Sequence, residues 1–136
     1  MADELTGGCA CGAVRYSVAG KPKYMGNCHC RDCQRATGSA YFPAVLVLAN
    51  EFTQHSGEVT WYESKADSGE TMQRAFCPHC GSPLFLRNTA RTGGVVLYAG
   101  SLDDPGIYEP SRDIYTSSAQ PWDVMHAHLP KFAQMP

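Results

Sequence analysis

Seven cysteines in a chain of 136 residues limit the folds open to this sequence more than any other property. They fall into three groups with none outside, namely Cys9 and Cys11, then Cys28, Cys30 and Cys33, then Cys77 and Cys80. A disulfide framework would favour an even number of cysteines and a secretory signal. The first residues have neither the basic nor the apolar region of such a signal. We therefore expect a cytoplasmic chain whose reduced thiols bind metal.

The composition excludes several classes of protein. A length of 136 residues corresponds to about one domain, so we expect residues 1–136 to form a single domain. With 43% hydrophobic and 18% charged residues, the chain resembles neither a disordered segment nor a coiled coil. A net charge of −2 offers no excess of basic residues for nucleic acid. No apolar run reaches the ~20 residues that span a bilayer, so we expect no membrane partner.

Alternating apolar residues predict a mainly β fold of many short strands. Val14, Tyr16 and Val18 alternate directly after the first cysteine pair. Glycine, proline, asparagine and aspartate separate further runs that are rich in β-branched and aromatic residues. These runs cover residues 41–48, 59–62, 72–76, 84–86 and 95–98.

Three segments add detail to this pattern. Pro43 has no backbone N–H, which predicts that the strand over 41–48 lies at a sheet edge or carries a bulge. Residues 31–37 are expected to form a short helix that ends at Gly38. The tail over 123–132 is expected to hold another short helical piece.

Two cysteine pairs together have the composition of a closed metal site. Cys77 and Cys80 are two residues apart and precede Gly81, whose tolerance of positive φ suits a tight turn around one ion. Glycines also flank Cys9 and Cys11 and allow that closer pair to bend. Four thiolates form the usual structural zinc site. A redox role for the Cys-x-x-Cys pair is the weaker hypothesis, because no thioredoxin-like βαβ pattern surrounds it.

The remaining group, Cys28, Cys30 and Cys33, offers three ligands. Three protein ligands with an open fourth position are typical of a catalytic zinc site. Two alternatives stay open. Another partition could close a site from Cys28, Cys30 and a second pair, or His29 or a distant histidine could complete a second structural site. Seven thiolates and two Zn²⁺ would bring the net charge to about −5.

Three motifs and the tail resemble a known family. The motifs are Gly7-Gly8-Cys9-x-Cys11-Gly12-x-Val14-Arg15-Tyr16, Cys28-His29-Cys30-x-x-Cys33-Gln34-Arg35-x-Thr37-Gly38-Ser39 and Phe76-Cys77-Pro78-x-Cys80-Gly81-Ser82-Pro83-Leu84. The tail adds Pro110, Ile114-Tyr115, Pro121-Trp122, Leu129-Pro130 and Phe132. On these residues the chain resembles the glutathione-dependent formaldehyde-activating (GFA-type) family, which also includes animal centromere protein V. In one departure, Asp113 stands where the family often has histidine.

The resemblance implies a fold, two zinc ions per chain as cofactors, and an activity. The fold is Mss4-like, with several short coiled antiparallel sheets stapled by zinc. The activity is that of a carbon–sulfur lyase acting on adducts of a small thiol, such as glutathione, with formaldehyde or a related small aldehyde. The implied ligands of two zinc ions per chain are Cys9, Cys11, Cys77 and Cys80 at a structural site and Cys28, Cys30 and Cys33 at a catalytic site. The competing class is a non-catalytic zinc-binding scaffold or interaction module with two structural sites.

Few other residues are candidates for the chemistry. His29 could relay a proton, and Arg31 and Arg35 could hold a substrate carboxylate. The plainer interpretations are a supporting or surface histidine and solvated loop arginines. The remaining polar and aromatic candidates are expected to be structural or solvated: Asp32 and Gln34 in turns and caps, Tyr115 and Trp122 in the core, and His126 and His128 in a loop.

Overall fold

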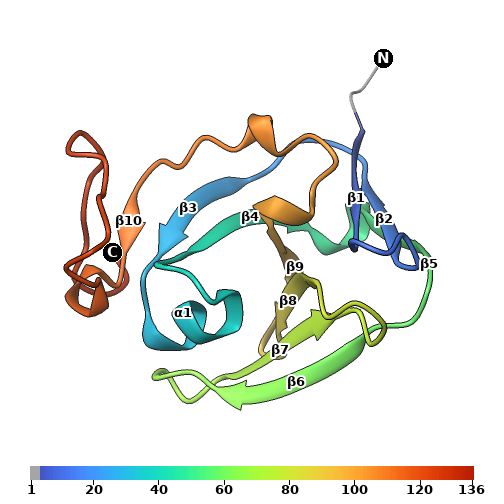
Figure 1. The fold of residues 1–136 in the computed structure, drawn as a ribbon, viewed down its shortest axis with the longest axis horizontal. Coiled ribbons are helices and arrows are strands. Elements are labelled where there is room, and N and C mark those ends of the chain that lie inside the picture. The colour runs from blue at the N-terminus through green and yellow to red at the C-terminus, as the bar shows by residue number, and fades with distance from the viewer. Residues whose placement is uncertain (1–3) are drawn as a thin grey trace.

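The structure is a computed structural model that describes residues 4–136, and it is built around two β-sheets (Figure 1). The smaller sheet has the strand order β1-β2-β5. Its strands pair antiparallel, and Leu5 of β1 lies opposite Val18 of β2. The bounds of these strands are Leu5–Gly8 for β1, Arg15–Val18 for β2 and Phe52–Ser56 for β5.

The larger sheet has the order β10-β3-β4-β9-β8-β7-β6. All of its neighbours pair antiparallel except β10 and β3, which are parallel. The bounds are Tyr24–Cys28 for β3, Phe42–Leu48 for β4, Thr60–Lys65 for β6, Thr71–Phe76 for β7, Pro83–Asn88 for β8, Arg91–Tyr98 for β9 and Asp113–Ile114 for β10. The mainly β prediction is confirmed.

Helical structure in the described residues is short. Helix α1 spans Arg31–Thr37 and ends at Gly38, whose φ of 69° is left-handed, as the sequence predicts. The other helical elements are single 3₁₀ turns: η1 (Ala49–Glu51), η2 (Ala99–Ser101), η3 (Pro105–Ile107) and η4 (Thr116–Ser118). Figure 1 shows α1 between the C-terminal tail, at the end opposite the three-stranded sheet, and strands β7 and β8.

The central strands of the larger sheet bury both of their faces. On β4, Val45 and Val47 belong to the core cluster shared with the smaller sheet, whereas Phe42 and Ala44 belong to a second cluster with Cys28 and Cys33. The same alternation separates Leu97 from Tyr98 on β9 and Phe85 from Leu86 on β8. Because side chains alternate between the faces of a strand, one sheet supports two cores. The second core holds the three-cysteine group.

Two local predictions are wrong, one for Pro43 and one for the tail over 123–132. Strand β4 is an inner strand rather than an edge strand, and its pairing with β3 shows no bulge at Pro43. Proline is tolerated because the pairing of β4 with β9 begins only at Ala44, so the ladder on that side needs no N–H from Pro43.

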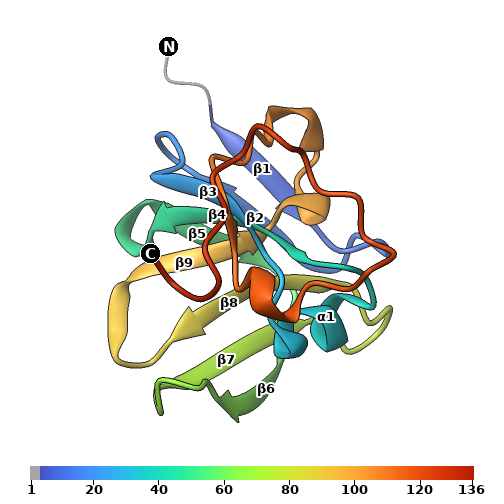
Figure 2. The same ribbon diagram turned by 90° about the vertical axis from the view of Figure 1, so that its left-hand side faces the viewer.

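The tail over 123–132 contains no helix. Its backbone hydrogen-bonds to β10 instead: Asp113 N–H donates to the Pro130 carbonyl, and Phe132 N–H donates to the Asp113 carbonyl. These bonds replace the internal bonds of a helix and hold the tail, orange to red in Figure 2, over the end of the sheet that carries β10.

Candidate metal centres

The first cysteine group is assembled from two distant loops. Cys9 and Cys11 follow β1, and Cys77 and Cys80 lie in the turn between β7 and β8. One sulfur from each of these four residues lies within 4.8 Å of all the others. The Sγ atoms of Cys9 and Cys11 are 3.6 Å apart, and those of Cys11 and Cys77 are 3.8 Å apart. Tetrahedral Zn–S bonds of about 2.3 Å place sulfurs about 3.8 Å apart, so this donor set fits Zn²⁺.

Backbone amides and one hydroxyl favour thiolates in this group. Val14 N–H donates to Cys9 Sγ at 3.3 Å, and His79 N–H donates to Cys77 Sγ at 3.4 Å. The Ser82 side chain lies 3.2 Å from Cys80 Sγ, and its hydrogen bond lowers the pKa of Cys80 to about 5. Gly81 has φ of 74°, which confirms the positive φ expected after the second cysteine pair. The pKa of Cys11 is instead raised to about 11, because a backbone hydrogen bond from Ala13 lowers it but hydrogen bonding to Cys9 and burial outweigh that bond. The turn thus presents N–H and O–H donors to the sulfurs of Cys77 and Cys80.

The second cysteine group surrounds the start of α1. Cys28 ends β3, Cys30 is the N-cap of α1, and Cys33 lies in the first turn of the helix. The Cys33 N–H donates to Cys30 Sγ at 3.3 Å, and the three sulfurs lie within 4.8 Å of one another. Cys28 and Cys33 are buried, and Cys30 is partly exposed. An all-sulfur donor set favours a thiophilic ion such as Zn²⁺.

The proton affinities of these three thiols differ. Hydrogen bonds from Cys28 and Cys33 lower the pKa of Cys30 to about 2, although burial opposes this. Hydrogen bonding to Cys30 raises the pKa of Cys28, and hydrogen bonding to Cys33 and burial raise it further. The pKa of Cys33 is raised as well, because its hydrogen bond to Cys28 lowers that pKa but the hydrogen bond to Cys30 and burial outweigh it. These shifts favour a single thiolate, at Cys30, with the protons on Cys28 and Cys33. A divalent cation would replace those protons and stabilise all three thiolates at once.

His29 does not join this donor set. It is buried, its Nε2 lies 2.9 Å from Asp113 Oδ1, and its Nδ1 lies 3.1 Å from Asp123 Oδ2. Only the contact with Asp113 is a hydrogen bond, since Nδ1 and Asp123 Oδ2 are close but both lack a hydrogen-bond partner. Both ring nitrogens thus lie beside carboxylates rather than sulfurs. Asn27 and Lys131 also contact Asp113, at 3.0 and 2.9 Å. Burial raises the pKa of Asp113, but the hydrogen bonds from His29, Lys131 and Asn27 outweigh it and hold that pKa below its usual range.

Arg31 and Arg35 are both exposed, as the plainer interpretation of the sequence has it. The guanidinium of Arg31 hydrogen-bonds to the Gln34 side chain. Gln34 itself is buried and caps no helix; its amide donates to the carbonyls of His29, at 2.7 Å, and Ser118, at 2.9 Å. Gln34 therefore connects the start of α1 to the C-terminal segment.

Of the two aromatic residues predicted to lie in the core, one does and one does not. Tyr115 is partly buried against the second core, as expected, and has a φ of 56°, the one positive value among the described residues other than glycine. Trp122 is 65% exposed, so its assignment to the core is wrong. The tail runs along β10 through backbone hydrogen bonds and leaves the indole outside both core clusters. His126 and His128 are exposed, with ring centroids 5.3 Å apart.

Arg74 is a residue that the sequence interpretation missed. It lies on β7, and its guanidinium donates to Cys33 Sγ at 3.8 Å and to the Tyr98 hydroxyl at 3.0 Å. A charged residue within an otherwise amphipathic strand carries no sequence signal that sets it apart from a solvated arginine. Only the order of the strands brings β7 next to the start of α1.

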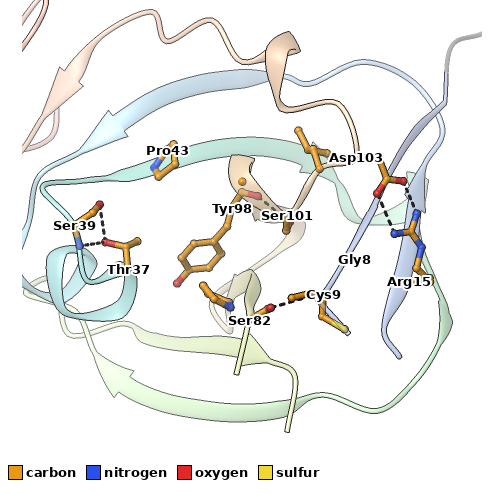
Figure 3. Close-up of a pocket in the computed structure, with 14 residues that line it drawn as sticks. Gly8, Cys9, Arg15, Thr37, Ser39, Pro43, Ser82, Tyr98, Ser101 and Asp103 are labelled. Carbon is orange, nitrogen blue, oxygen red and sulfur yellow. Dashed lines mark hydrogen bonds and ion pairs between the residues drawn. The ribbon is translucent and has the colours of Figure 1, made fainter. Parts of the chain in front are cut away.

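A cavity of about 610 Å³ lies between the first cysteine group and the end of α1 (Figure 3). Cys9 and Ser82 line it near the first group, and Thr37 and Ser39 line it at the end of α1. Figure 3 shows the Tyr98 ring between these two sides. The one cation among the lining residues, Arg15, is paired with Asp103. The cavity is thus lined by apolar side chains, among them Pro43, Pro83 and Leu102, together with hydroxyls, and its lining residues offer no unpaired positive charge.

In residues 4–136, no helix is both long and apolar enough to cross a membrane. Comparison with known proteins gives the following similarities. Residues 4–118 match the family model described as glutathione-dependent formaldehyde-activating enzyme. A Halomonas elongata protein named "Putative glutathione-dependent formaldehyde-activating enzyme" is 30% identical over 112 residues, which cover 79% of this chain and 71% of that protein. A crystal structure of a Rhodobacter sphaeroides protein superposes with a TM-score of 0.59 at 17% identity, covering 93% of this chain and 98% of the other.

Proposed function

Because this chain belongs to the glutathione-dependent formaldehyde-activating family, we propose that it is a zinc-dependent carbon–sulfur lyase acting on adducts of a small thiol with a small aldehyde. The proposed reaction is the reversible addition of a thiol, glutathione in the first instance, to formaldehyde. A carbon–sulfur bond forms, the carbonyl π bond opens, and the proton of the thiol ends on the oxygen. No electron donor or acceptor is needed. We propose a cytoplasmic location, where glutathione is abundant and thiols stay reduced.

The observation that carries this proposal is the three-sulfur donor set of Cys28, Cys30 and Cys33. No fourth cysteine, histidine or carboxylate of residues 4–136 completes this group. His29 hydrogen-bonds to Asp113 through Nε2 and lies beside Asp123 with Nδ1, and its absence from the sulfur group supports an open fourth position over a closed site. In contrast, the first group has four sulfurs and needs no further ligand. We therefore assign Cys9, Cys11, Cys77 and Cys80 to a structural zinc site and the three-cysteine group to the reacting site.

The donor set also favours thiol chemistry over hydrolysis. A zinc ion bound there would lower the pKa of an exchangeable thiol and hold it as a thiolate. Three thiolate ligands donate much charge, which disfavours activation of a carbonyl and suits the exchange of sulfur ligands. The protein supplies a rigid frame for this step, because Cys30 and Cys33 are fixed by the first turn of α1 and Cys28 by its pairing with Phe42 on β4.

The buried group around His29 has a supporting part in this proposal. Cys28 and Cys30 flank His29, so its contacts with Asp113 and Asp123 hold the loop that carries two of the three sulfurs. Gln34 holds the same loop from the other side, through the carbonyl of His29. Neither exposed arginine of α1 contacts the cysteines, and Arg31 and Arg35 remain available only for a part of a substrate that extends into solvent.

The test is magnetisation exchange between ¹³C-labelled formaldehyde and its glutathione adduct, measured by NMR with and without the zinc-loaded protein. The proposal expects faster exchange with the wild-type protein and with Glu109→Ala, a change at an exposed residue. Cys28→Ser should return exchange to the buffer rate. No acceleration by the wild-type protein with glutathione would contradict the named reaction. Replacement of glutathione by cysteine or 2-mercaptoethanol then shows which thiol the site takes.

A further inference from the structure

Arg74 is a partly buried cation beside the three-cysteine group. Its guanidinium donates to Cys33 Sγ at 3.8 Å and to the Tyr98 hydroxyl at 3.0 Å. No carboxylate oxygen of residues 4–136 lies within 4.0 Å of it, since Arg74 takes part in none of the ion pairs of this part of the chain. A buried arginine is costly unless an anion compensates it. Its two acidic neighbours are the Tyr98 hydroxyl, at 3.0 Å, and the Cys33 thiol, at 3.8 Å, and the thiol is the one that a bound metal ion would deprotonate.

The position of Arg74 is fixed by packing. Tyr98 is only 4% exposed, and its ring packs on Phe42 with centroids 4.2 Å apart. Its hydroxyl therefore holds the guanidinium at a defined place beside Cys33. An arginine side chain, unlike a lysine or a histidine, is not deprotonated in proteins. The side chain thus carries a permanent positive charge at this site.

The charges of the site balance only when Arg74 is counted. Three thiolates around a divalent cation carry one net negative charge, which Arg74 neutralises. Without Arg74, an incoming anion would meet a site of like charge, and a neutral ligand would be preferred. With Arg74, the site is neutral overall and has a cation directed at its sulfurs. Opposite charges at such short range in a partly buried site interact more strongly than they do in water.

We propose that Arg74 is a specificity-determining residue that makes the three-cysteine site select an anionic fourth ligand, such as a thiolate, over a neutral one. This inference rests on the open fourth position of the proposed function and names what that position selects. Arg74 acts through the charge of the site and through Cys33, and Tyr98 is its positioning residue.

The test measures ligand binding to the cobalt-substituted protein by the visible spectrum of Co²⁺, which changes when a fourth ligand binds. Azide is the anionic probe, imidazole the neutral one and glutathione the thiol. In Arg74→Met, we expect the dissociation constant of azide to rise about tenfold, equivalent to about 1.4 kcal/mol, with that of imidazole unchanged or lower. Arg74→Lys should restore part of the azide affinity, because the charge is kept and the planar guanidinium is lost.

Two further variants complete the test. Tyr98→Phe keeps Arg74 and removes only the hydroxyl that orients it, so it should weaken azide binding in the same direction but less. Arg87→Met is the matched control. Arg87 lies on β8, and its guanidinium is 4.1 Å from the centre of the Trp61 ring on β6 and makes no hydrogen bond to a cysteine. It should leave both constants unchanged. Cobalt content of two per chain verifies that each variant keeps both sites.

Equal effects of Arg74→Met on azide and imidazole would overturn the inference, as would no effect on either. The measurements with glutathione distinguish failure of this inference from failure of the proposed function. If the wild-type spectrum responds to azide but not to glutathione, the thiol reaction is contradicted while the charge selection by Arg74 stands. If glutathione binds equally well to wild type and Arg74→Met, the reaction stands and the role of Arg74 fails.

Discussion

His29 Nε2 lies 2.9 Å from Asp113 Oδ1, and both side chains are only 1% exposed. The two residues are far apart in the chain, and the parallel pairing of β10 with β3 brings them together by placing Ile114 opposite Cys28. Lys131 and Asn27 hold the same carboxylate, and Asp123 faces the other nitrogen of the ring. The tail is thereby attached to the loop that carries Cys28 and Cys30.

Asp113→Ala should strongly destabilise the protein. The change leaves His29, Lys131 and Asn27 without their shared partner in a buried site, and loss of one member of such a network costs about 3 kcal/mol or more. Urea unfolding of the zinc-loaded protein measures the loss. Glu109→Ala, at an exposed position before the same strand, is the control and should change stability by less than about 0.5 kcal/mol. A loss below about 1 kcal/mol for Asp113→Ala would show that the network contributes little.

Elemental analysis should give about two zinc ions per chain, with the two sites separable by mutation. Cys28→Ser should lower the content to about one and leave the fold largely intact, because the four-cysteine site still joins the β1 loop to the β7–β8 turn. Cys9→Ser should destabilise the domain severely, because it opens that connection. Circular dichroism and thermal unfolding compare the two variants. If both variants unfold to the same extent, the non-catalytic module with two structural sites is the better interpretation.

Gly81→Ala should destabilise the β7–β8 turn by about 1 kcal/mol, because a side chain disfavours the left-handed backbone at φ 74°. Space is not the reason, since a Cβ at this position would meet no atom within 4 Å. Gly93→Ala is the matched control: its Cβ also meets nothing within 4 Å, and its φ is not left-handed. Thermal unfolding should separate the two. Similar effects of both changes would show that backbone conformation at Gly81 is not limiting.

The ion pair between Arg15 and Asp103 should make a small contribution to stability that depends on pH. Hydrogen bonds from Arg15 and Thr6 lower the pKa of Asp103 from 3.8 to about 2. A carboxyl whose pKa is lower in the folded state stabilises the fold above its unfolded pKa, and loses that effect as the pH falls toward its folded pKa. Because both side chains are more than a third exposed, at 40% and 45%, the contribution is at most about 1 kcal/mol.

Comparison of the wild type with Asp103→Asn measures this contribution, because both proteins lose zinc alike as the pH falls. The difference in unfolding free energy should be constant from pH 7 to 5 and begin to shrink near pH 4. A difference that already declines between pH 7 and 6 would assign the effect to another group.

Local sequence determined the parts of this protein whose partners lie within a few residues. The spacing in Cys28-x-Cys30-x-x-Cys33 predicts three sulfurs around one turn of helix, and Gly38 predicts where α1 ends; both hold in the structure. Runs of apolar and β-branched residues predict strands β4, β7 and β9, because successive side chains along a strand point to opposite faces of the sheet. Spacing and number favour a partition of the seven cysteines into four and three without excluding others, and the structure assembles these two groups.

Only the tertiary structure decided which distant residues meet. The strand order places Arg74 beside Cys33, and the parallel pairing of β10 places Asp113 beside His29. Pairing with β10 also kept the tail from forming the predicted helix and left Trp122 exposed. Such contacts depend on the register and order of whole strands, which a few residues of sequence do not encode. The cysteines specify that metal can bind, and the fold determines the charges that surround it.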